Sequence, residues 1–461
     1  MEPLFTNDAV VFGLLTLVLG AIFYTSKLPA FRRFYNIVPT LVLCYFVPAF
    51  LYWPLGLIAP EWFDPGLVKY LAEKGLALPE SGMSVSEIKN WLAGQGVPKE
   101  EYGKFIRKSQ LYFVASRYLL PASLLLLCIS IDLKGILRLG PKALIMFFTA
   151  TLGIVIGGPV ALLLVSYIMP GVINVSPDEL WRGLSTIAGS WIGGGANQTA
   201  MKEIFNVGDS LFGTMIIVDV LVANIWMAFL LYGASISGKL DVKLKADNSA
   251  IADLEQRISA FRASIERVAT ARHLFMLLAV AFGGVALSHL VADWAVPLLS
   301  KSKQALQDAG MDSLLEPFFW IVVVSTTVGL LLSFTRARQL EGVGASTWGT
   351  LFIYILVTTI GMKMNVGEIF ENLGLFAIGL VWMAVHVTLL LLVAKLIRAP
   401  FFFVAVGSQA NVGGAASAPI VASAFSPSLA PVGVLMAVLG YALGTYGALI
   451  CAFLMRGVAG G

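Results

Sequence analysis

Long apolar stretches alternate with short polar ones along almost the whole chain. About 20 apolar residues in a helix are enough to cross a bilayer, whereas a transmembrane barrel would show alternating strands of about ten residues. The pattern therefore predicts an all-α polytopic membrane protein. We expect about twelve membrane helices, at residues 8–25, 37–58, 111–131, 143–169, 182–204, 210–234, 273–297, 317–335, 346–362, 373–397, 400–425 and 431–455.

Two polar stretches lie between these helices. Residues 59–110 predict a small extramembrane insertion, and residues 236–272 predict a soluble linker. In the linker, apolar residues recur at heptad spacing from Ile251 to Val268. This spacing suits a helix pair that joins two copies into a homodimer. For so short a helix it suits better a lone amphipathic helix that docks on the protein or on the membrane.

Glycine-rich, amide-bearing interruptions occur in two of the apolar stretches, starting at Gly189 and Gly407. Glycine costs about 1 kcal/mol in a helix interior, so both helices are predicted to be broken. In a membrane, the freed backbone groups must face protein or a wet cavity. Two breaks at corresponding places in two halves indicate the binding site of a secondary transporter.

The two halves are related by a weak internal repeat. An offset that pairs Ser190 with Ser408 makes 8 of the 36 positions from 189 to 224 identical. We therefore expect a first transmembrane repeat at 1–235, which contains the insertion, and a second at 273–461. Charge bias in the loops favours inverted repeats. Counting from one matched element to the other gives six spans, whereas inversion needs an odd number. This count favours parallel repeats, unless one segment, such as 273–297, does not cross the membrane.

Composition strengthens the membrane assignment. Of the 461 residues, 58% are hydrophobic and 13% are charged, against about 25% charged in soluble domains. The net charge of +4 predicts no nucleic-acid partner. The three cysteines and three histidines are scattered, and no catalytic motif is present. We therefore expect no enzyme, no transition metal and no organic cofactor.

Acidic residues precede the first apolar run, and basic residues follow it. Glu2 and Asp8 come before the run, whereas a signal peptide begins with a basic segment. Lys27, Arg32 and Arg33 follow it, which predicts a cytoplasmic first loop.

Asp219 lies near the middle of the sixth predicted helix. A charge at mid-bilayer costs about 2.5–3.5 kcal/mol, so intramembrane acids usually mark ion or proton paths. The alternative is a structural acid bonded to a neighbour such as Asn224. Neutral oxygens at the breaks suit a hard cation such as Na⁺. The candidate cation ligands are Ser190, Asn197, Gln198, Thr199, Asp219, Ser408, Gln409, Asn411 and Ser417.

The same breaks expose helix N-termini, whose partial positive charge suits an anionic group. The candidate residues for binding a solute are Gly194, Gly195, Gly413, Gly414, Tyr441 and Thr445. The alternative is that small residues only permit close helix packing, but packing does not account for the clustered Asn and Gln.

Three motifs carry a resemblance to a known family. The residues 189–197, 410–419 and 439–447 resemble the YjcL-like family of bacterial membrane proteins, a family of unknown function. That family is grouped distantly with sodium-coupled bile-acid and glutamate symporters and with sodium/proton antiporters. The resemblance implies a panel domain and a core domain, broken helices that cross at 182–204 and 400–425, and a multi-pass protein of the bacterial cytoplasmic membrane.

One departure concerns the second crossing. Bile-acid-type relatives have an acid there, and this chain has none between Lys395 and Gly461. Asp219 is the candidate substitute. We expect a sodium-coupled symporter of a small organic anion, such as an amino acid, a peptide or a carboxylate, that works by alternating access. The alternatives are a proton-coupled antiporter that uses Asp219, and a channel or receptor without uphill transport.

Overall fold

The computed structural model describes residues 3–460 apart from 36–37, 39, 78–84, 130–138, 170, 172, 247–268, 309–311, 365–373 and 427–428. The heptad stretch from Ile251 to Val268 therefore lies outside the described residues. The chain divides into two compact units, which are Met1–Ser116 with Tyr354–Glu368 and Arg117–Ile353 with Ile369–Gly461.

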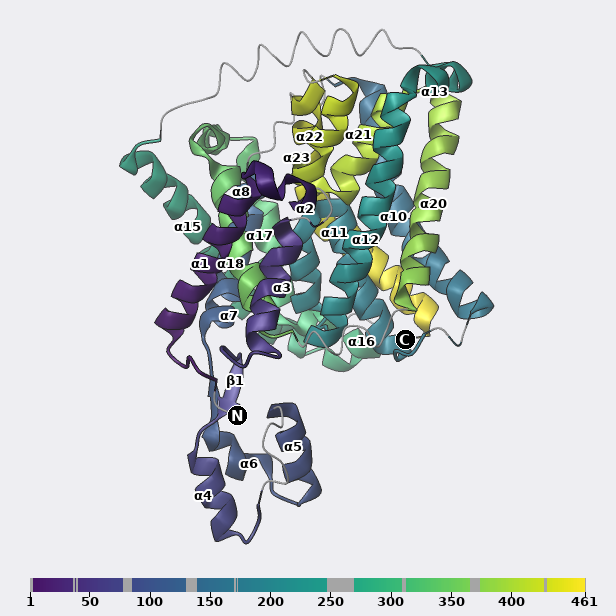
Figure 1. Cartoon of the computed structure of the whole chain (residues 1–461). Helices are drawn as coiled ribbons and strands as arrows, with labels where there is room; N and C mark the ends of the chain where they lie inside the picture. The colour runs from purple at the N-terminus through teal and green to yellow at the C-terminus, as the bar shows by residue number, and fades with distance from the viewer. Residues whose placement is uncertain are drawn as a thin grey trace. The chain divides into compact units, whose positions relative to one another are not determined.

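Among its described residues, the first unit contains one helix with the length and hydropathy of a membrane span, a shorter apolar helix and the insertion. The insertion has a hydrophobic core of its own around Leu71, Leu92 and Tyr102. Its two strands pair antiparallel, with Glu61 opposite Lys108. The elements are α1 (Asp8–Ser26), η1 (Pro29–Phe31), α2 (Arg32–Tyr35), α3 (Thr40–Tyr52), β1 (Glu61–Phe63), α4 (Gly66–Glu73), α5 (Val85–Gly94), α6 (Lys99–Tyr102), η2 (Gly103–Phe105), β2 (Ile106–Lys108) and α7 (Leu111–Val114) (Figure 1).

The second unit is a bundle of longer helices. Its elements are η3 (Ala115–Leu119), α8 (Leu120–Ile129), α10 (Pro141–Ile168), α11 (Pro177–Ile204), α12 (Asp209–Ser235), α13 (Ser237–Leu244), α15 (Ala271–Ser300), α16 (Lys303–Asp308), η5 (Asp312–Leu315), α17 (Pro317–Ser333), η6 (Arg336–Val343), α20 (Leu375–Ile397), α21 (Phe401–Val412), α22 (Gly414–Phe425) and α23 (Ala430–Ala459). The helix α18 (Ala345–Gly361) runs across the division between the units.

All twelve predicted segments coincide with helices, but fewer of them have the length and hydropathy of a membrane span. Among the described residues, seven helices do, or eight if α17 and η6, which are bent by 97°, count as one span. The segment 273–297, which we suspected of not crossing, forms the 30-residue helix α15 and is one of the seven.

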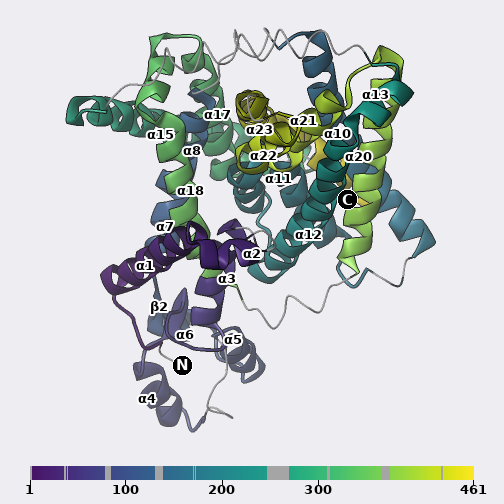
Figure 2. The ribbon, with the colours of Figure 1, turned by 45° about the horizontal axis from the view of Figure 1, so that its top comes forward.

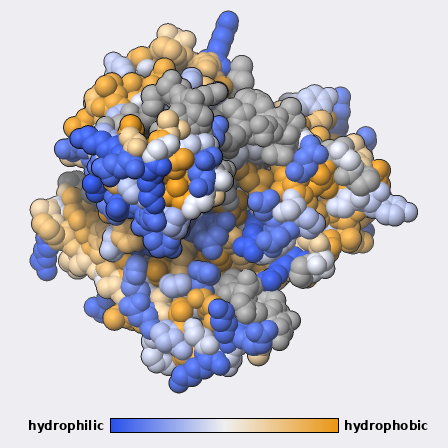
Figure 3. Space-filling view, turned by 90° about the horizontal axis from the view of Figure 1, so that it is seen from below, coloured by the Kyte–Doolittle hydropathy of each residue, from blue (hydrophilic) through white to orange (hydrophobic). Residues whose placement is uncertain are grey.

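Large hydrophobic side chains lie exposed along these helices, among them Leu17, Phe229, Trp294 and Leu396. Figure 3 shows broad hydrophobic areas on the face that it draws. Exposed apolar area of this extent marks an interaction surface, and for apolar helices of spanning length that surface is lipid.

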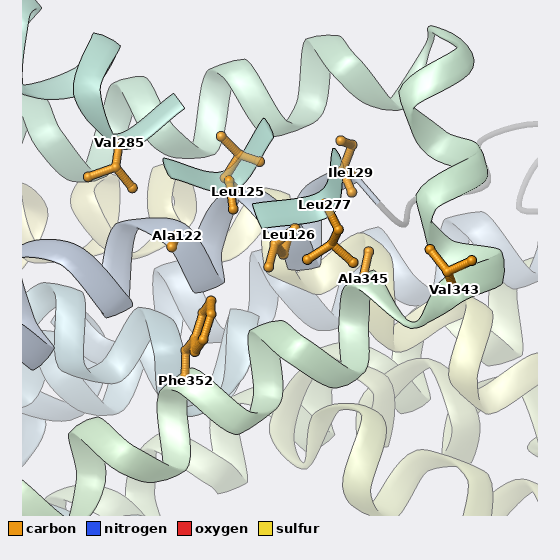
Figure 4. Packing of buried hydrophobic residues seen from close by; sticks show 10 residues of the cluster. Ala122, Leu125, Leu126, Ile129, Leu277, Val285, Val343, Ala345 and Phe352 are labelled. Carbon is orange, nitrogen blue, oxygen red and sulfur yellow. The ribbon is translucent and has the colours of Figure 1, made fainter. Parts of the chain in front are cut away.

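One core of the second unit joins α8, α15, η6 and the start of α18. Leu125 and Leu126 of α8 pack with Leu277 of α15 and with Phe352 of α18 (Figure 4). A Cβ on Gly329 of α17 would stand 2.6 Å from the carbonyl oxygen of Leu125. These helices therefore approach closely, as small residues allow in membranes.

The helix α11 is broken at Gly194, and its second part folds back along the first. Gly194 has φ 74° and ψ −174°. The Arg182 guanidinium donates to the carbonyl of Phe205 at 3.1 Å, and the Trp181 and Phe205 rings are 5.1 Å apart. A straight helix would separate these residues by roughly 35 Å. The segment is therefore a helical hairpin with its tip at Gly194.

The helices α21 and α22 form a second hairpin, with its tip at Gly413 and Gly414. The rings of Phe402 and Phe425 lie 5.3 Å apart, although a straight helix would separate them by about 35 Å. Both expected breaks are present. The resemblance implied two broken helices that cross each other, and in the structure each of them reverses direction at its break, where Gly194 and Gly414 have positive φ angles.

The two hairpins start from opposite ends of α12, a 27-residue helix about 40 Å long. At its beginning, Lys202 of the first hairpin forms an ion pair with Asp209 at 2.9 Å. At its end, Phe401 of the second hairpin packs on Gly233. Figure 1 shows α21 and α22 in the upper part of this unit and α11 below them.

A hairpin returns to the end at which it starts, so α11 no longer counts among the helices that separate the two breaks. The described apolar helices between the hairpins are α12, α15, α17, α18 and α20. Three of them, α12, α15 and α20, have the length and hydropathy of a span, or four if α17 and η6 count as one, so the count alone does not decide between inverted and parallel repeats. The inverted repeat stays a prediction, and the opposed hairpins fit it.

Candidate functional site

The two hairpin tips meet beside the middle of α23. A Cβ on Gly440 would lie 2.6 Å from the carbonyl oxygen of Ile192 and 3.5 Å from that of Ala410. Gly444 would place a Cβ 2.5 Å from Gly193 Cα. Glycines on α23 therefore let both tips approach its backbone. Figure 2 shows α11, α21, α22 and α23 gathered together.

Asp219 of α12 lies against the first tip. Its carboxylate accepts hydrogen bonds from Ser190 Oγ at 2.6 Å, Trp191 Nε1 at 2.7 Å and Gln198 Nε2 at 3.0 Å. Ser190 and Trp191 precede the break, and Gln198 follows it. One carboxylate therefore holds both arms of the hairpin. Asn224, the neighbour considered above, bonds instead to the Val220 carbonyl of its own helix.

The Asp219 carboxylate has neutral partners only. Its side chain is buried, with 6% exposed, and no Lys or Arg among the described residues forms an ion pair with it. Burying a charge without a counter-charge costs much more than burying a paired one. Four carboxylate lone pairs face three donors, so one acceptor position remains. A cation or a proton at this position would balance the charge.

Asn197 fastens the first tip to α23. Its amide group donates to the carbonyls of Gly193 at 3.0 Å and Tyr441 at 3.1 Å. Its oxygen accepts from Thr445 Oγ1 at 2.6 Å, and Thr445 lies 3.1 Å from Thr326 Oγ1 of α17. Both amide hydrogens and one lone pair are therefore in use.

Asn411 fastens the second tip to α10 in the same way. Its amide donates to the carbonyls of Gly407 at 3.0 Å and Phe147 at 3.3 Å. Its oxygen accepts from Thr151 Oγ1 at 2.8 Å. In each case the amide bonds the carbonyl four residues back, and the threonine lies one turn beyond the second carbonyl. The matched pattern describes anchors for the tips rather than open ligands.

Ser408 takes part in a buried chain of hydrogen bonds behind the second hairpin. His386 Nδ1 lies 3.1 Å from the Ala150 carbonyl, which can only accept, so this nitrogen carries the proton. Nε2 then accepts from Ser408 Oγ at 2.8 Å, and Ser408 accepts from Trp226 Nε1 at 2.8 Å. The hydroxyl proton of Ser408 is therefore committed to His386.

Gln409 and Ser417 bridge the two arms of the second hairpin. Gln409 Nε2 donates to Ser417 Oγ at 2.6 Å. Gln409 Oε1 is buried, and no described residue donates to it. At the first tip, Thr199 Oγ1 donates to the Gly195 carbonyl at 2.9 Å. The second tip thus presents a buried acceptor that the protein does not use.

Four helix ends converge at the tips. The first arms, 177–193 and 401–412, point their C-termini at the centre, and the second arms, 195–204 and 414–425, begin there. C-terminal ends carry partial negative charge and N-terminal ends partial positive charge. The centre therefore offers places for a cation and for an anion side by side.

The predicted site residues gather in distinct groups. Ser190, Gln198 and Asp219 are together, as are Asn197, Tyr441 and Thr445, and Gln409 and Ser417. Gly194 and Gly414 form the turns. Trp191, Trp226, Thr151 and His386 were not among the predicted residues. Their types suggest ordinary packing, and only the position of Trp191 within the first break gave a signal.

Groups of three or more His, Cys, Asp or Glu side chains able to hold a metal ion do not occur in the part of the chain that the structure describes. The chemistry of the tips is that of neutral amides, hydroxyls and carbonyls around one carboxylate.

Comparison with known proteins supports the resemblance given by the motifs. The chain is similar to the "Uncharacterized membrane protein YjcL" of Bacillus subtilis (strain 168), with 24% identity over 354 residues, which are 74% of this chain and 82% of the relative. The family model described as "Protein of unknown function (DUF819)" matches residues 103–458, which include both hairpins. The chain therefore belongs to the DUF819 family, whose description gives no function.

Proposed function

We propose that this protein is a secondary active transporter that couples the movement of Na⁺ to that of a small organic anion. The observation that carries the proposal is the Asp219 carboxylate, which is buried against the first of two opposed hairpin tips and has no ion pair with any described Lys or Arg. Intramembrane acids of this kind mark ion paths. In this proposal the protein is not an enzyme, and Na⁺ is its coupling ion rather than a resident cofactor.

The cation binds at the first hairpin. Asp219 supplies the charge, and Ser190 Oγ and Gln198 Oε1 supply neutral oxygens. The C-terminal end of the first arm adds carbonyls with partial negative charge. Carboxylate, carbonyl and hydroxyl oxygens suit hard cations, and one carboxylate balances one Na⁺.

The anionic group of the solute binds at the second hairpin. The N-terminus of α22 begins at Gly414, and its free N–H groups and partial positive charge favour an anion. The chain has no acid between Lys395 and Gly461, so the hairpin itself carries no carboxylate that would repel an anion, and Asp241, which accepts from the Phe401 N–H at 2.8 Å, lies at the base of the hairpin. The cation and the anion then neutralise each other across the tips.

The opposed hairpins support alternating access in the cytoplasmic membrane of a bacterium. Each hairpin reaches the centre from one end of α12, so each stands between the centre and one side of the membrane. Opening one at a time would expose the site to one side at a time. A homodimer joined through the linker belongs to the same proposal.

A proton is the second candidate for the coupling ion, because protonation of Asp219 also removes the uncompensated charge. This version makes the protein a proton-coupled antiporter. It shares the site with the first version but not the ion. A channel or receptor would bind the same ions without uphill transport.

The test is the thermal stability of the purified protein in NaCl against matched KCl and choline chloride. A bound ion stabilises the folded state by mass action. We expect a sodium-specific rise that Asp219→Asn abolishes and Asn224→Ala retains. A pH-dependent stability that Asp219→Asn flattens, without a sodium effect, would support the proton version. The absence of both effects would contradict ion coupling at this site.

A further inference from the structure

We propose that Gln409 Oε1 accepts a hydrogen bond from a donor group next to the anionic group of the solute. The solute would then be an α-amino or α-hydroxy acid rather than a plain carboxylate. The inference rests on the proposed function and narrows its solute class. It follows from three features of the second tip, which are the unused acceptor, its place beside a helix N-terminus, and the pair of helix ends there.

The first feature is the unused acceptor itself. Gln409 is 2% exposed, and its amide is oriented by the bond from Nε2 to Ser417 Oγ at 2.6 Å. Oε1 then points away from Ser417, and no described residue donates to it. A buried amide oxygen without a donor costs about 1–3 kcal/mol. A ligand that brings a donor would recover this free energy.

The second feature is the position of the amide at the start of α22. A Cβ on Gly413, the residue that precedes α22, would lie 2.2 Å from Gln409 Nε2 and 3.1 Å from Gln409 Cδ, so the nitrogen side of the amide faces Gly413. On Gly414, the first residue of α22, a Cβ would have no described atom outside its chain neighbours within 4 Å. A carboxylate on the N–H groups of Gly414 and the next residues would therefore have the Gln409 amide as its neighbour.

The third feature is the pair of helix ends at this tip. The N-terminus of α22 carries partial positive charge and favours the carboxylate of the solute. Gln409 lies in the last turn of α21, whose C-terminal end carries partial negative charge, so Oε1 can accept from an ammonium or a hydroxyl group of the same solute. An amino or hydroxyl group on the carbon next to a carboxylate has this geometry, because the two groups are one carbon apart.

The site is expected to discriminate strongly. A site built to bond a donor rejects the analogue that lacks it, because its buried acceptor is then left unpaired. A lost bond of about 1.4 kcal/mol corresponds to tenfold in affinity, so we expect tenfold or more between matched solutes.

The experiment measures solute binding to the purified protein in saturating NaCl by calorimetry, with three sets of matched probes. They are propionate, L-lactate and L-alanine; succinate, L-malate and L-aspartate; and phenylpropionate, L-phenyllactate and L-phenylalanine. In at least one set we expect the donor-bearing acids to bind tenfold or more tightly than the plain carboxylate.

The variant Gln409→Met removes the acceptor and keeps the length of the side chain. We expect it to lower the affinity for the donor-bearing acids to that of the plain carboxylate, whose own affinity does not change. Gln95→Met, on the exposed surface of the insertion, serves as the matched control.

Three results would overturn the inference. The first is equal or tighter binding of the plain carboxylates to the wild type. The second is no binding by any donor-bearing acid. The third is a loss of affinity in Gln409→Met that is the same for all members of a set. A sodium-specific stabilisation that persists in these cases would leave the proposed function standing, whereas its absence would remove both.

Discussion

Asn197 and Asn411 use their side chains alike, at the tips of different hairpins. Each joins its hairpin to one long helix, α23 or α10, through a carbonyl and a threonine hydroxyl. Amides with these bonds already made have little left to offer a ligand. At the residue scale, the polar groups at the tips thus divide into anchors, a charged cation site and an unused acceptor.

The anchoring role predicts a loss of stability that ligands do not influence. Asn197→Ala and Asn411→Ala leave buried partners unpaired, at about 1–3 kcal/mol per group. We expect both variants to unfold at lower temperature than the wild type, to the same extent with and without Na⁺. Asn224→Ala, which removes a bond within one helix, is the control. A variant with wild-type stability that no longer responds to Na⁺ would show that the asparagine is a ligand.

The charged residues of the insertion predict that it loses stability at low pH. The backbone N–H of Gly66 and the Arg107 guanidinium lower the pKa of Asp64, and Lys74, followed by Tyr70, lowers the pKa of Glu101. A carboxyl group whose pKa is lower in the folded state than in the unfolded state stabilises the fold at pH values above its unfolded pKa. This contribution is lost as the pH falls through the folded pKa. Residues 59–110 should therefore lose stability below about pH 4.

Hydrogen exchange of the full-length protein, corrected for intrinsic rates, measures this loss. Protection of residues 59–110 should fall between pH 6 and pH 3, and Asp64→Asn should reduce the fall. Protection that is equal at both pH values would contradict the role of the two carboxylates.

For the polar residues at the tips, the sequence alone predicted the side chains but not their hydrogen-bond partners. Asp219 and Ser190 were predictable because a charge within an apolar stretch and polar groups within a glycine-rich break are costly there. The Asp219–Trp191 bond was not predictable, because tryptophan in a membrane helix usually signals packing. Thr151 and Phe147, the hydrogen-bond partners of Asn411, belong to α10, which is far away in the chain. No local sequence pattern connects them to Asn411.

At the scale of elements, the hairpin is the feature that determines the site. A glycine run predicts that a helix breaks, since glycine weakens helices, but the angle of the break depends on φ and ψ at one residue. Gly194 adopts φ 74° and ψ −174°, a conformation that is essentially restricted to glycine. The break was therefore predictable from sequence, and the reversal of the chain was not.

Replacing this glycine tests the reversal. Gly194→Ala introduces backbone strain of about 1–3 kcal/mol, although a Cβ there would meet only Tyr441 Cε1 at 3.7 Å. We expect a clear fall in thermal stability. Gly283→Ala in α15, where a Cβ would meet no described atom within 4 Å, should be neutral or stabilising by about 0.5–1 kcal/mol. Equal effects of the two changes would argue against a reversed chain at Gly194.

At the scale of the whole second unit, the hairpins reach the centre from opposite ends of α12. The twelve predicted segments had the right positions, since apolar length and helix formation go together. Their topology did not follow from hydropathy, because α11 and the α21–α22 pair are apolar enough to resemble spans while they return to the end at which they start.

Labelling from the two sides of the membrane tests this topology. Cysteines placed at Glu179 and Ala424 lie exposed at the bases of the first and second hairpins. The native cysteines Cys44, Cys128 and Cys451 are buried. A membrane-impermeant thiol reagent should label Glu179→Cys and Ala424→Cys from opposite sides of the membrane. One variant should be labelled in right-side-out vesicles and the other in inside-out vesicles. Labelling of both from one side would contradict opposed hairpins.

The most direct measurement of the central claim is equilibrium binding of radioactive ²²Na⁺ to the purified protein. We expect saturable binding to the wild type, which unlabelled Na⁺ displaces and choline does not. Asp219→Asn should abolish this binding, and Asn224→Ala should retain it. Saturable binding that Asp219→Asn leaves unchanged, or no saturable binding to the wild type, would contradict a sodium site at the meeting point of the hairpins.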